Sequence, residues 1–422
     1  MPPPRPPRRV PALAAAAALA LALTACGPTD GRVQIDFFQF KSEAQDDFAY
    51  LVEKFEQENP DIDVVYNVMP DPDTAIRTLL VKGRTPDVIT LNGSGTFAQL
   101  ARTGVFYDFT GDPLLAEINP APLAIVNNLG TYHGDEINSL PYLSNADGII
   151  YNRTIFAEQG LAIPTTWDEL IAVCDALQSA GITPFYGTLA DAWTALPSLN
   201  ALGSYATATG FLDRLKEAGA DAADHPQDSF TANFGQALDR QAQLFAYANP
   251  DYRARTYDDG NLAFANGETA MLLQGIWALS QIRAHNPDID AGIFPYPADT
   301  PEEAVIVSGV DVTVTMARDT DHPDEARRFI EFLFRSDNIE WIAERQAMFS
   351  ARADTPGSSD PALAEIQPLI DAGRVAPFLD HQVPAAVPLQ QIDQQYLFDL
   401  DRATALAALD REWNKVARRT TR

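Results

Sequence analysis

The sequence predicts an α/β protein with more than one domain, and three observations support this. The chain has 422 residues, which is too long for a single small hydrophobic core. Hydrophobic residues make up 46% and charged residues 21% of the chain, as in ordinary soluble globular proteins. Between residues 35 and 102, strand patterns alternate with helix patterns. This alternation is typical of a parallel sheet that is covered by helices on both faces.

The clearest helix pattern of this region lies at residues 43–58. Phe48, Leu51, Val52 and Phe55 recur there at the spacing of one helix face, and Asn59-Pro60 ends the pattern. The same reasoning gives three strands and three helices in turn. The expected strands are 35–40, 63–69 and 87–91, and the expected helices are 43–58, 73–82 and 96–102.

Further along, residues 145–152 predict a strand. Thr166 and Glu169 form a capping-box pattern that opens a helix through Leu177, and this helix places Cys174 on its apolar face. We therefore expect Cys174 to be an inert core residue. The remaining expectations are mainly helical structure over 190–290, strands over 291–297 and 305–316, one long helix over 323–345, irregular proline-rich structure over 355–388, and a last helix over 400–418.

The N-terminus has the composition of an export signal. Arg5, Arg8 and Arg9 precede a run of Ala and Leu, and the run ends in Leu-Thr-Ala-Cys at residues 23–26. These four residues resemble the bacterial lipobox, in which the signal is cleaved before the cysteine and the cysteine carries lipid. This resemblance implies a signal peptide over 1–25 and a lipid anchor on Cys26. The alternative is an ordinary cleaved signal that leaves a free thiol.

Charge and motifs exclude several classes of function. The formal net charge is −28, which argues against a nucleic-acid partner because phosphate binding needs clustered Lys and Arg. The sequence contains no phosphate-binding loop, no G-x-S-x-G nucleophile and no zinc motif among its five scattered His. We expect no metal and no cofactor. The many carboxylates leave an exported carbohydrate-active enzyme as an alternative, although no motif indicates one.

Residues 93–98 spell G-x-G-x-x-A between a predicted strand and a predicted helix. This setting could indicate a dinucleotide-binding enzyme. However, the segment follows the third strand rather than the first, where the nucleotide fingerprint normally lies. We expect the glycines to permit a tight turn that exposes Asn92 and Ser94.

Several segments, in order, resemble one known family. They are "TPDVITLNGSGTFAQLARTGVFYDF", "LPYLSNADGIIYNRTIFAEQGLAIPTTWDEL", "FANGETAMLLQGIW", "IFPYP", "VSGVDVTV" and "HPDEARRFIEFLFRSDNIEWIAERQAMFSARAD". Together they are similar to the family 1 extracellular solute-binding proteins of ABC sugar importers. The resemblance spans roughly residues 32–420.

The resemblance implies a two-lobed α/β fold of the periplasmic-binding-protein type, with hinge crossovers and a cleft between the lobes. It implies one lobe from 26–143 plus 298–347 and a second from 144–297 plus 348–422. It also implies that the chain is a monomer on the outer face of the cytoplasmic membrane, is anchored there through Cys26, and delivers a sugar to ABC permease subunits. A di- or oligosaccharide fits better than an anion, because no basic cluster marks the candidate loops, and a glycerophosphodiester or a polyol is an alternative. Such a protein needs neither an enzymatic reaction nor a nucleic acid.

A sugar-binding cleft needs aromatic rings for the apolar faces of the sugar and polar groups for its hydroxyls. Some candidates follow from strand ends and loops, and others, such as Trp277, follow from the family pattern. A hinge role is an equal alternative for Asn145 and Asp147. Tyr142 and Arg352 are weaker candidates, and the other three Trp are expected in the core. The expected ligand-binding residues are Lys41, Glu43, Asn92, Asn145, Asp147, Asp191, Trp193, Gln274, Trp277 and Asp311.

Overall fold

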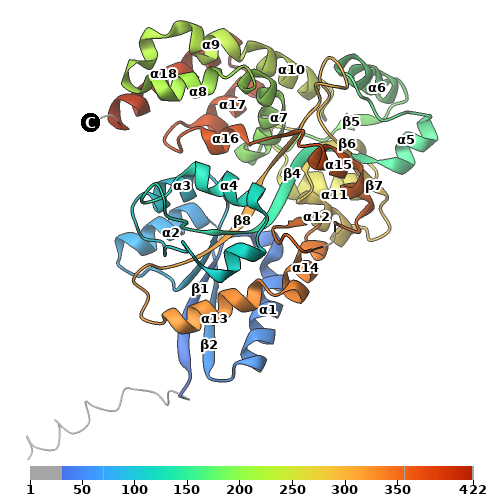
Figure 1. Ribbon diagram of the computed structural model, residues 1–422. Helices are drawn as coiled ribbons and strands as arrows, with labels where there is room; N and C mark the ends of the chain where they lie inside the picture. Colours follow the sequence, from blue (N-terminus) through green and yellow to red (C-terminus); the bar gives the residue numbers. More distant parts are fainter. Residues whose placement is uncertain (1–30, 70, 356, 421–422) are drawn as a thin grey trace, which may run out of the picture.

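The computed structural model describes residues 31–69, 71–355 and 357–420. In Figure 1 the chain forms two lobes, and two long strands, β4 (Leu140–Asn152) and β8 (Ile306–Met316), run between them. The two-lobed α/β fold expected from the sequence is confirmed. The division of the chain into 26–143 plus 298–347 and 144–297 plus 348–422 stays a prediction.

The first six expected elements are all present, with ends that differ from the expected ones by one or two residues. They are β1 (Val33–Gln39), α1 (Gln45–Glu58), β2 (Ile62–Val68), α2 (Pro72–Val81), β3 (Val88–Leu91) and α3 (Gly95–Ala101). α1 is preceded by a short 3-10 helix, η1 (Ser42–Ala44). The side chain of Asp71 accepts a hydrogen bond from the backbone of Thr74, and this cap fixes the start of α2.

The remaining elements complete the first lobe, build the second lobe and connect the two (Figure 1). The strands are β5 (Thr183–Phe185), β6 (Thr269–Gly275), β7 (Ala291–Phe294), β9 (Phe349–Ser350) and β10 (Val375–Ala376). The helices are α4 (Pro120–Leu129), α5 (Arg153–Gln159), α6 (Trp167–Ser179), α7 (Leu196–Thr207), α8 (Phe211–Ala218), α9 (Phe230–Asn233), α10 (Gly235–Phe245), α11 (Tyr257–Ala265), α12 (Ala278–His285), α13 (Pro323–Leu333), α14 (Ser336–Arg345), α15 (Pro361–Asp371), α16 (Leu379–Gln382), α17 (Leu389–Phe398) and α18 (Arg402–Thr420). Short 3-10 helices are η2 (Pro113–Glu117), η3 (Ala192–Ala195), η4 (Gly219–Asp224) and η5 (Pro226–Asp228).

One sheet connects both lobes, with the strand order β2-β1-β3-β8-β4-β6-β5. β1 pairs in parallel with β2 and β3, as the alternating pattern predicted. The expectation of a parallel sheet is wrong beyond β3, because β3–β8, β8–β4 and β4–β6 are antiparallel. β8 returns from the far lobe late in the chain, so the early βα repeats could not predict its direction.

The pairing of β4 with β8 is irregular at the point where the strands pass between the lobes. Pro141 pairs with Thr313, Leu143 with Val312, and Ser144 with Val310. Tyr142 and Asp311 are therefore extra residues without a partner in this ladder. Such bulges bend a strand and change the direction of a side chain.

The expectation of mainly helical structure over 190–290 is confirmed, with the exception of β6, a fully buried strand. Its apolar run without alternation has the same appearance in a buried helix. Two other expectations are wrong. The segment 355–388 contains α15, which starts at the cap Asp360 with Pro361 in the first turn, a position that proline favours. The single helix over 323–345 is divided into α13 and α14 at Arg335, whose ψ is 139°.

The capping box at Thr166 and Glu169 is confirmed. Cys174 is fully buried in the large core cluster, as predicted, and burial raises the pKa of its thiol to about 12. The predicted lipid anchor, Cys26, and the signal peptide lie outside the described residues. Within the described ranges, no helix combines the length and apolar character that crossing a membrane requires.

One buried carboxyl group predicts how stability depends on pH. Asp393 is 2% exposed, and Gln241 donates a hydrogen bond of 3.0 Å to it. Burial raises the pKa of Asp393 to about 8, whereas the pKa of an Asp in an unfolded chain is about 4. Between these values only the folded state holds the proton. Folding stability should therefore fall by up to about 1.4 kcal/mol per pH unit from this group as pH rises through the window.

We expect Asp393→Asn to remove this contribution, so that the variant gains stability relative to the parent as pH rises from 5 to 8. Urea unfolding at several pH values measures the difference. The exposed Asp221→Asn is the control for the carboxyl-to-amide change itself. Parallel pH curves for the parent and the Asp393 variant would contradict the prediction.

Candidate ligand-binding site

The carboxylate of Asp311 is the centre of a buried polar cluster at the crossing strands. The ammonium Nζ of Lys41 lies 2.9 Å from its Oδ2. The side-chain amides of Asn145 and Asn92 donate hydrogen bonds of 2.9 and 3.3 Å to its Oδ1. The side chains of Lys41 and Asp311 are only 5% and 8% exposed. The structure thus brings together four of the residues that the sequence predicted.

The fold explains why these four side chains meet. Lys41 follows β1 and Asn92 follows β3, and the carboxyl ends of parallel strands lie at one edge of a sheet. Asp311 lies at the bulge of β8, next to Asn145 on β4. The loop after β3 is held against β8 by a hydrogen bond of 3.0 Å from the amide of Gly93 to the carbonyl of Val310.

Gly93 is needed for this close approach rather than for the backbone conformation of a tight turn. A Cβ at this position would lie 2.7 Å from the carbonyl oxygen of Val310. Neither Gly93 nor Gly95 has a positive φ. The expected order of strand, tight turn and helix is confirmed, because only residues 92–94 separate β3 from α3. The glycine at position 93 is required by the close contact with Val310 and not by a left-handed backbone.

The charges in the cluster stabilise one another. Burial opposes the charge of Lys41, but Asp311 and Glu43 outweigh it and raise the pKa of Lys41 above its usual value. Burial likewise opposes the charge of Glu43, and Lys41 outweighs it and lowers the pKa of Glu43. Lys41 is thus charged and is shared between two carboxylates.

One aromatic side chain, Tyr257, lies near this cluster, and a second, Trp193, packs against Tyr257. The rings of Trp193 and Tyr257 lie 4.9 Å apart. Asp191 accepts a hydrogen bond of 2.8 Å from the backbone amide of Tyr257, so it positions this ring at the start of α11. Burial raises the pKa of Tyr257 well above its usual value, and the nearby charges of Glu43 and Asp311 raise it further. The Tyr257 hydroxyl therefore lies close to the carboxylates of the cluster.

Several buried polar atoms around the cluster have no hydrogen-bond partner among the described residues. Unpaired buried polar groups are costly, and native proteins normally satisfy them. Both lobes contribute such atoms here, and together they offer hydrogen-bond acceptors and donors. They are Gln39 Oε1, Asn92 Oδ1, Asn145 Oδ1, the Tyr257 hydroxyl, and both polar atoms of the Asn261 side chain.

A second group of predicted residues lies further along β4. The indole of Trp277 donates a hydrogen bond of 3.2 Å to Gln274, so these two side chains bind each other. Asp147 is 1% exposed, and neither of its carboxyl oxygens has a partner among the described residues. Burial and the neighbouring Asp380 raise the pKa of Asp147 well above its usual value.

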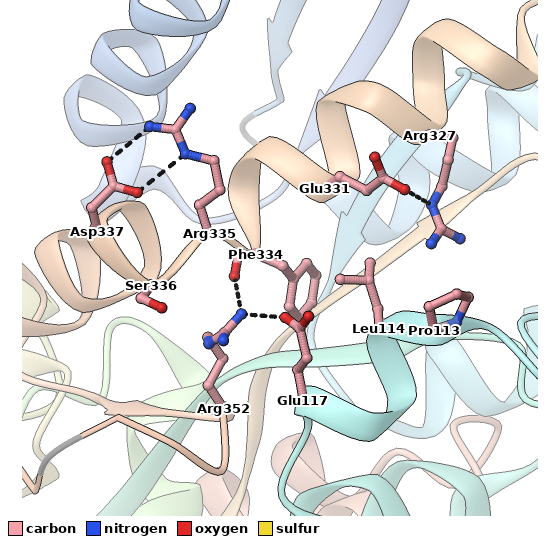
Figure 2. A pocket seen from close by; sticks show the side chains of 10 residues that line it. All are labelled: Pro113, Leu114, Glu117, Arg327, Glu331, Phe334, Arg335, Ser336, Asp337 and Arg352. Carbon is pink, nitrogen blue, oxygen red and sulfur yellow. Dashed lines mark hydrogen bonds and ion pairs between the residues drawn. The ribbon is translucent and has the colours of Figure 1, made fainter.

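The weaker candidates have structural contacts of their own. The hydroxyl of Tyr142 donates to the carbonyl of Leu333 inside the core, at 3.2 Å. Figure 2 shows Arg352 beside a pocket of ≈ 640 Å³, where it binds Glu117 and the carbonyl oxygen of Phe334 at 2.5 and 2.7 Å. Ser94 precedes α3, and its side chain makes no capping hydrogen bond.

A cavity of ≈ 1260 Å³ lies between the lobes, next to the crossing strands. α4 lines it from one side, and α8, α15 and α16 line it from the other. It touches β4 at Ser144 rather than at Asn145, and adjacent strand residues point to opposite faces. Of all predicted residues, only the weaker candidate Arg352 lines it.

Five residues that the structure places beside predicted site residues were not predicted from the sequence. A Thr-x-x-Asp capping box at Thr256 and Asp259 could have located the helix start at Tyr257. Gln39 ends β1 and could have been found as a strand-end residue. The other missed residues, Asn261, Tyr296 and Asp380, reach the site only through packing of segments that are distant in sequence.

Comparisons with known proteins identify this architecture. The profile of the bacterial extracellular solute-binding proteins matches residues 41–340, which is more than half of the chain. The chain belongs to this family. The family resemblance found in the sequence is thereby confirmed, and the members of the family are binding proteins.

Individual proteins to which the chain is similar are also binding proteins. The chain is 27% identical over 316 residues to the multiple sugar-binding protein of Streptococcus mutans, and the match covers 72% of this chain and 71% of that protein. It is 23% identical to the sn-glycerol-3-phosphate-binding periplasmic protein of Escherichia coli, over 77% and 76% of the two chains. RafE of Streptococcus pneumoniae in complex with raffinose has a TM-score of 0.78 and 22% identity, over 91% of this chain and 100% of that one. This last similarity shows the shared two-lobed fold.

We expect Asp311→Ala to destabilise the protein by about 3–5 kcal/mol, because it leaves the Lys41 ammonium buried without a partner. Urea unfolding measures the loss. The double variant Lys41→Met/Asp311→Leu should be more stable than Asp311→Ala, because it removes both charges and retains apolar volume. If the double variant is instead no more stable than Asp311→Ala, the loss in Asp311→Ala does not come from the unpaired Lys41 ammonium, and the prediction is wrong.

Proposed function

We propose that this protein captures a sugar between its lobes and delivers it to the permease of an ABC importer. The observation that supports this most strongly is the set of buried, unpartnered polar atoms that both lobes contribute around Asp311. A sugar hydroxyl both donates and accepts hydrogen bonds, so several hydroxyls can satisfy a mixed set of acceptors and donors. Binding would then remove the free-energy cost of leaving these buried polar atoms without hydrogen bonds.

The aromatic rings beside the polar atoms fit the same ligand. The C–H faces of a sugar ring are apolar, and the Trp193 and Tyr257 rings offer flat apolar surface next to the unpartnered Tyr257 hydroxyl. The sugar-binding relative in Streptococcus mutans and the raffinose complex of RafE support a di- or oligosaccharide as the ligand.

A phosphorylated ligand fits less well. The sn-glycerol-3-phosphate-binding relative raises this alternative. Lys41 is the cation of the cluster described above, and it is already paired with Asp311 while Glu43 lies nearby. A phosphate group placed here would meet two carboxylates, and like charges at close distance repel.

The site supports binding without a chemical step. The buried carboxylate of Asp311 accepts hydrogen bonds from two amides and pairs with Lys41, which is a fixed arrangement rather than a free acid or base. The alternative of an exported carbohydrate-active enzyme has no support from the family or from the relatives, which are binding proteins.

The same proposal includes the location of the protein. An extracellular solute-binding family implies export. We infer that residues 1–25 are removed as a signal peptide, that Cys26 carries the lipid anchor, and that the mature protein acts as a monomer on the outer face of the cytoplasmic membrane. Opening and closing of the two lobes around β4 and β8 would then report to the permease whether sugar is bound.

We expect calorimetric screening of mono- and oligosaccharides to find a binder, and Trp193→Ala to weaken it by ~1–3 kcal/mol through lost apolar contact. Tyr257→Phe should cost about 1 kcal/mol, because only the hydroxyl is lost. Trp341→Ala is the matched control, since that ring packs on Tyr50 of α1, 4.6 Å away, and not on the polar cluster. Unchanged affinity in both cleft variants would remove this face from the site.

The anchor is tested separately. Cys26→Ser should move the protein from the membrane fraction to the soluble fraction of the producing cells, because the acyl chains attach to this thiol. Cys174→Ser changes the buried cysteine and should leave the distribution between fractions unchanged. Membrane association that survives Cys26→Ser would contradict the lipid anchor.

A further inference from the structure

A second set of unpartnered polar atoms lies beyond Asn145 on β4. Asn145 and Asp147 are two residues apart on the strand, so they point to the same face, roughly 7 Å apart. Both carboxyl oxygens of Asp147 and the hydroxyl of Tyr296 are buried and have no partner among the described residues. The polar face of the cleft thus continues from the Asp311 cluster into the second lobe.

Asp380 faces Asp147 from α16. The two carboxyl groups are close enough for their charges to interact, and Asp147 in turn affects Tyr296. The backbone amide of Asp380 donates a hydrogen bond of 3.0 Å to Asn200 of α7, which holds α16 in place. One carboxyl oxygen of Asp380, Oδ1, is also buried without a partner among the described residues.

No Lys or Arg of the described residues forms an ion pair with Asp147 or Asp380. The ring Nε2 of His381 lies 4.0 Å from Oδ2 of Asp380. An uncompensated buried carboxylate is costly. Lys41, the cation of the neighbouring cluster, is committed to Asp311.

The pair is also short of ligands for a metal ion. Within the described residues, no three His, Cys, Asp or Glu side chains come together as such a site. An ammonium group needs a less specific set of ligands than a metal ion, because any three hydrogen-bond acceptors satisfy its three N–H donors. The carboxylates of Asp147 and Asp380 and the hydroxyl oxygen of Tyr296 provide acceptors of this kind.

The surroundings of the pair fit a sugar ring that carries this ammonium. Phe378 packs against Gly309, where an added Cβ would lie 2.7 Å from the Phe378 ring, and Gly309 pairs with Asn145. The Trp277 and Phe378 rings lie 6.5 Å apart. Phe378 and His381 also line the interlobe cavity of ≈ 1260 Å³, which gives this end of the cleft a route to solvent.

We propose that Asp147, Asp380 and Tyr296 form a subsite that binds the protonated amine of an amino sugar. This inference rests on the proposed sugar-binding function and specifies its ligand class. The subsite extends the Asp311 cluster, so an oligosaccharide with one amine-bearing ring would fill both. Neutral sugars would bind at the Asp311 cluster and leave the carboxyl pair without a cation.

The test compares three pairs of monosaccharides that differ only at carbon 2: glucosamine with glucose, galactosamine with galactose, and mannosamine with mannose. Calorimetry at pH 6.5 on the full chain should show at least one amino sugar binding roughly tenfold more tightly than its neutral partner, the gain of a charge-assisted hydrogen bond. Its N-acetyl derivative, which has no charge, should lose the gain.

Variants then test whether Asp147 and Asp380 cause the preference for the amino sugar. Asp147→Asn and Asp380→Asn should each abolish the preference for the amine, which is measured within each variant as the ratio of its affinities for the amino sugar and the neutral sugar of one pair. Asp393→Asn is the matched control, because it makes the same carboxyl-to-amide change at a residue that is 2% exposed, against 1% for Asp147. Circular dichroism and thermal unfolding of each variant confirm that it is folded.

The outcomes are distinct. Equal affinity for amino and neutral sugars, or a preference that survives Asp147→Asn, would overturn the subsite and leave the proposed function intact. Stabilisation by calcium chloride that Asp147→Asn abolishes would assign the pair to a metal ion and overturn it as well. Binding of sn-glycerol 3-phosphate together with no binding of any sugar would overturn the proposed function itself.

Discussion

The antiparallel pairing of β4 with β8 is the constraint on which the rest of the structure depends. These two strands are the longest of the described sheet and belong to both lobes. Their ladder is interrupted where the lobes meet, which leaves Asp311 without a partner in β4 and lets its carboxylate reach Lys41 and Asn92. One irregularity in the register thus converts a structural strand into the floor of a polar site.

The energetic consequence is that burying this polar cluster is costly. Burying an ion pair and several amides takes them out of water, and the mutual attraction of Lys41 and Asp311 offsets only part of that cost. The unpartnered atoms of Asn92, Asn145 and Tyr257 add to it. Under the proposed function, a ligand that satisfies these atoms stabilises the conformation in which they are buried. A receptor with two conformations needs such a difference in free energy to report whether ligand is bound.

The sequence predicted the parts of this fold whose signals are local. Helix α1 followed from the spacing of Phe48, Leu51 and Phe55, and α6 followed from its capping box. β6 and the antiparallel direction of β8 did not follow, because their environment is set by pairing with strands more than a hundred residues away.

The candidate site divides in the same way. Lys41 and Asn92 could be predicted because strand ends meet at one edge of a sheet, and Asp311 came from the family pattern. Asp380 could not, because it reaches β4 only after α16 packs on α7, and neither a residue pattern nor the expected irregular segment indicated that contact.

The acidity of the whole chain and that of the cleft have different physical meanings. Most of the net charge of −28 is solvated, and solvated charges contribute to solubility rather than to recognition. A buried carboxylate, by contrast, selects its partner strongly, because any ligand that leaves it unpaired carries the full desolvation cost. The Asp311 carboxylate has its cation within the protein, so it can accept neutral hydroxyl groups beside it. The carboxyl pair of Asp147 and Asp380 has no Lys or Arg partner among the described residues. In the subsite proposed above, selectivity therefore depends on the charge that the ligand itself carries.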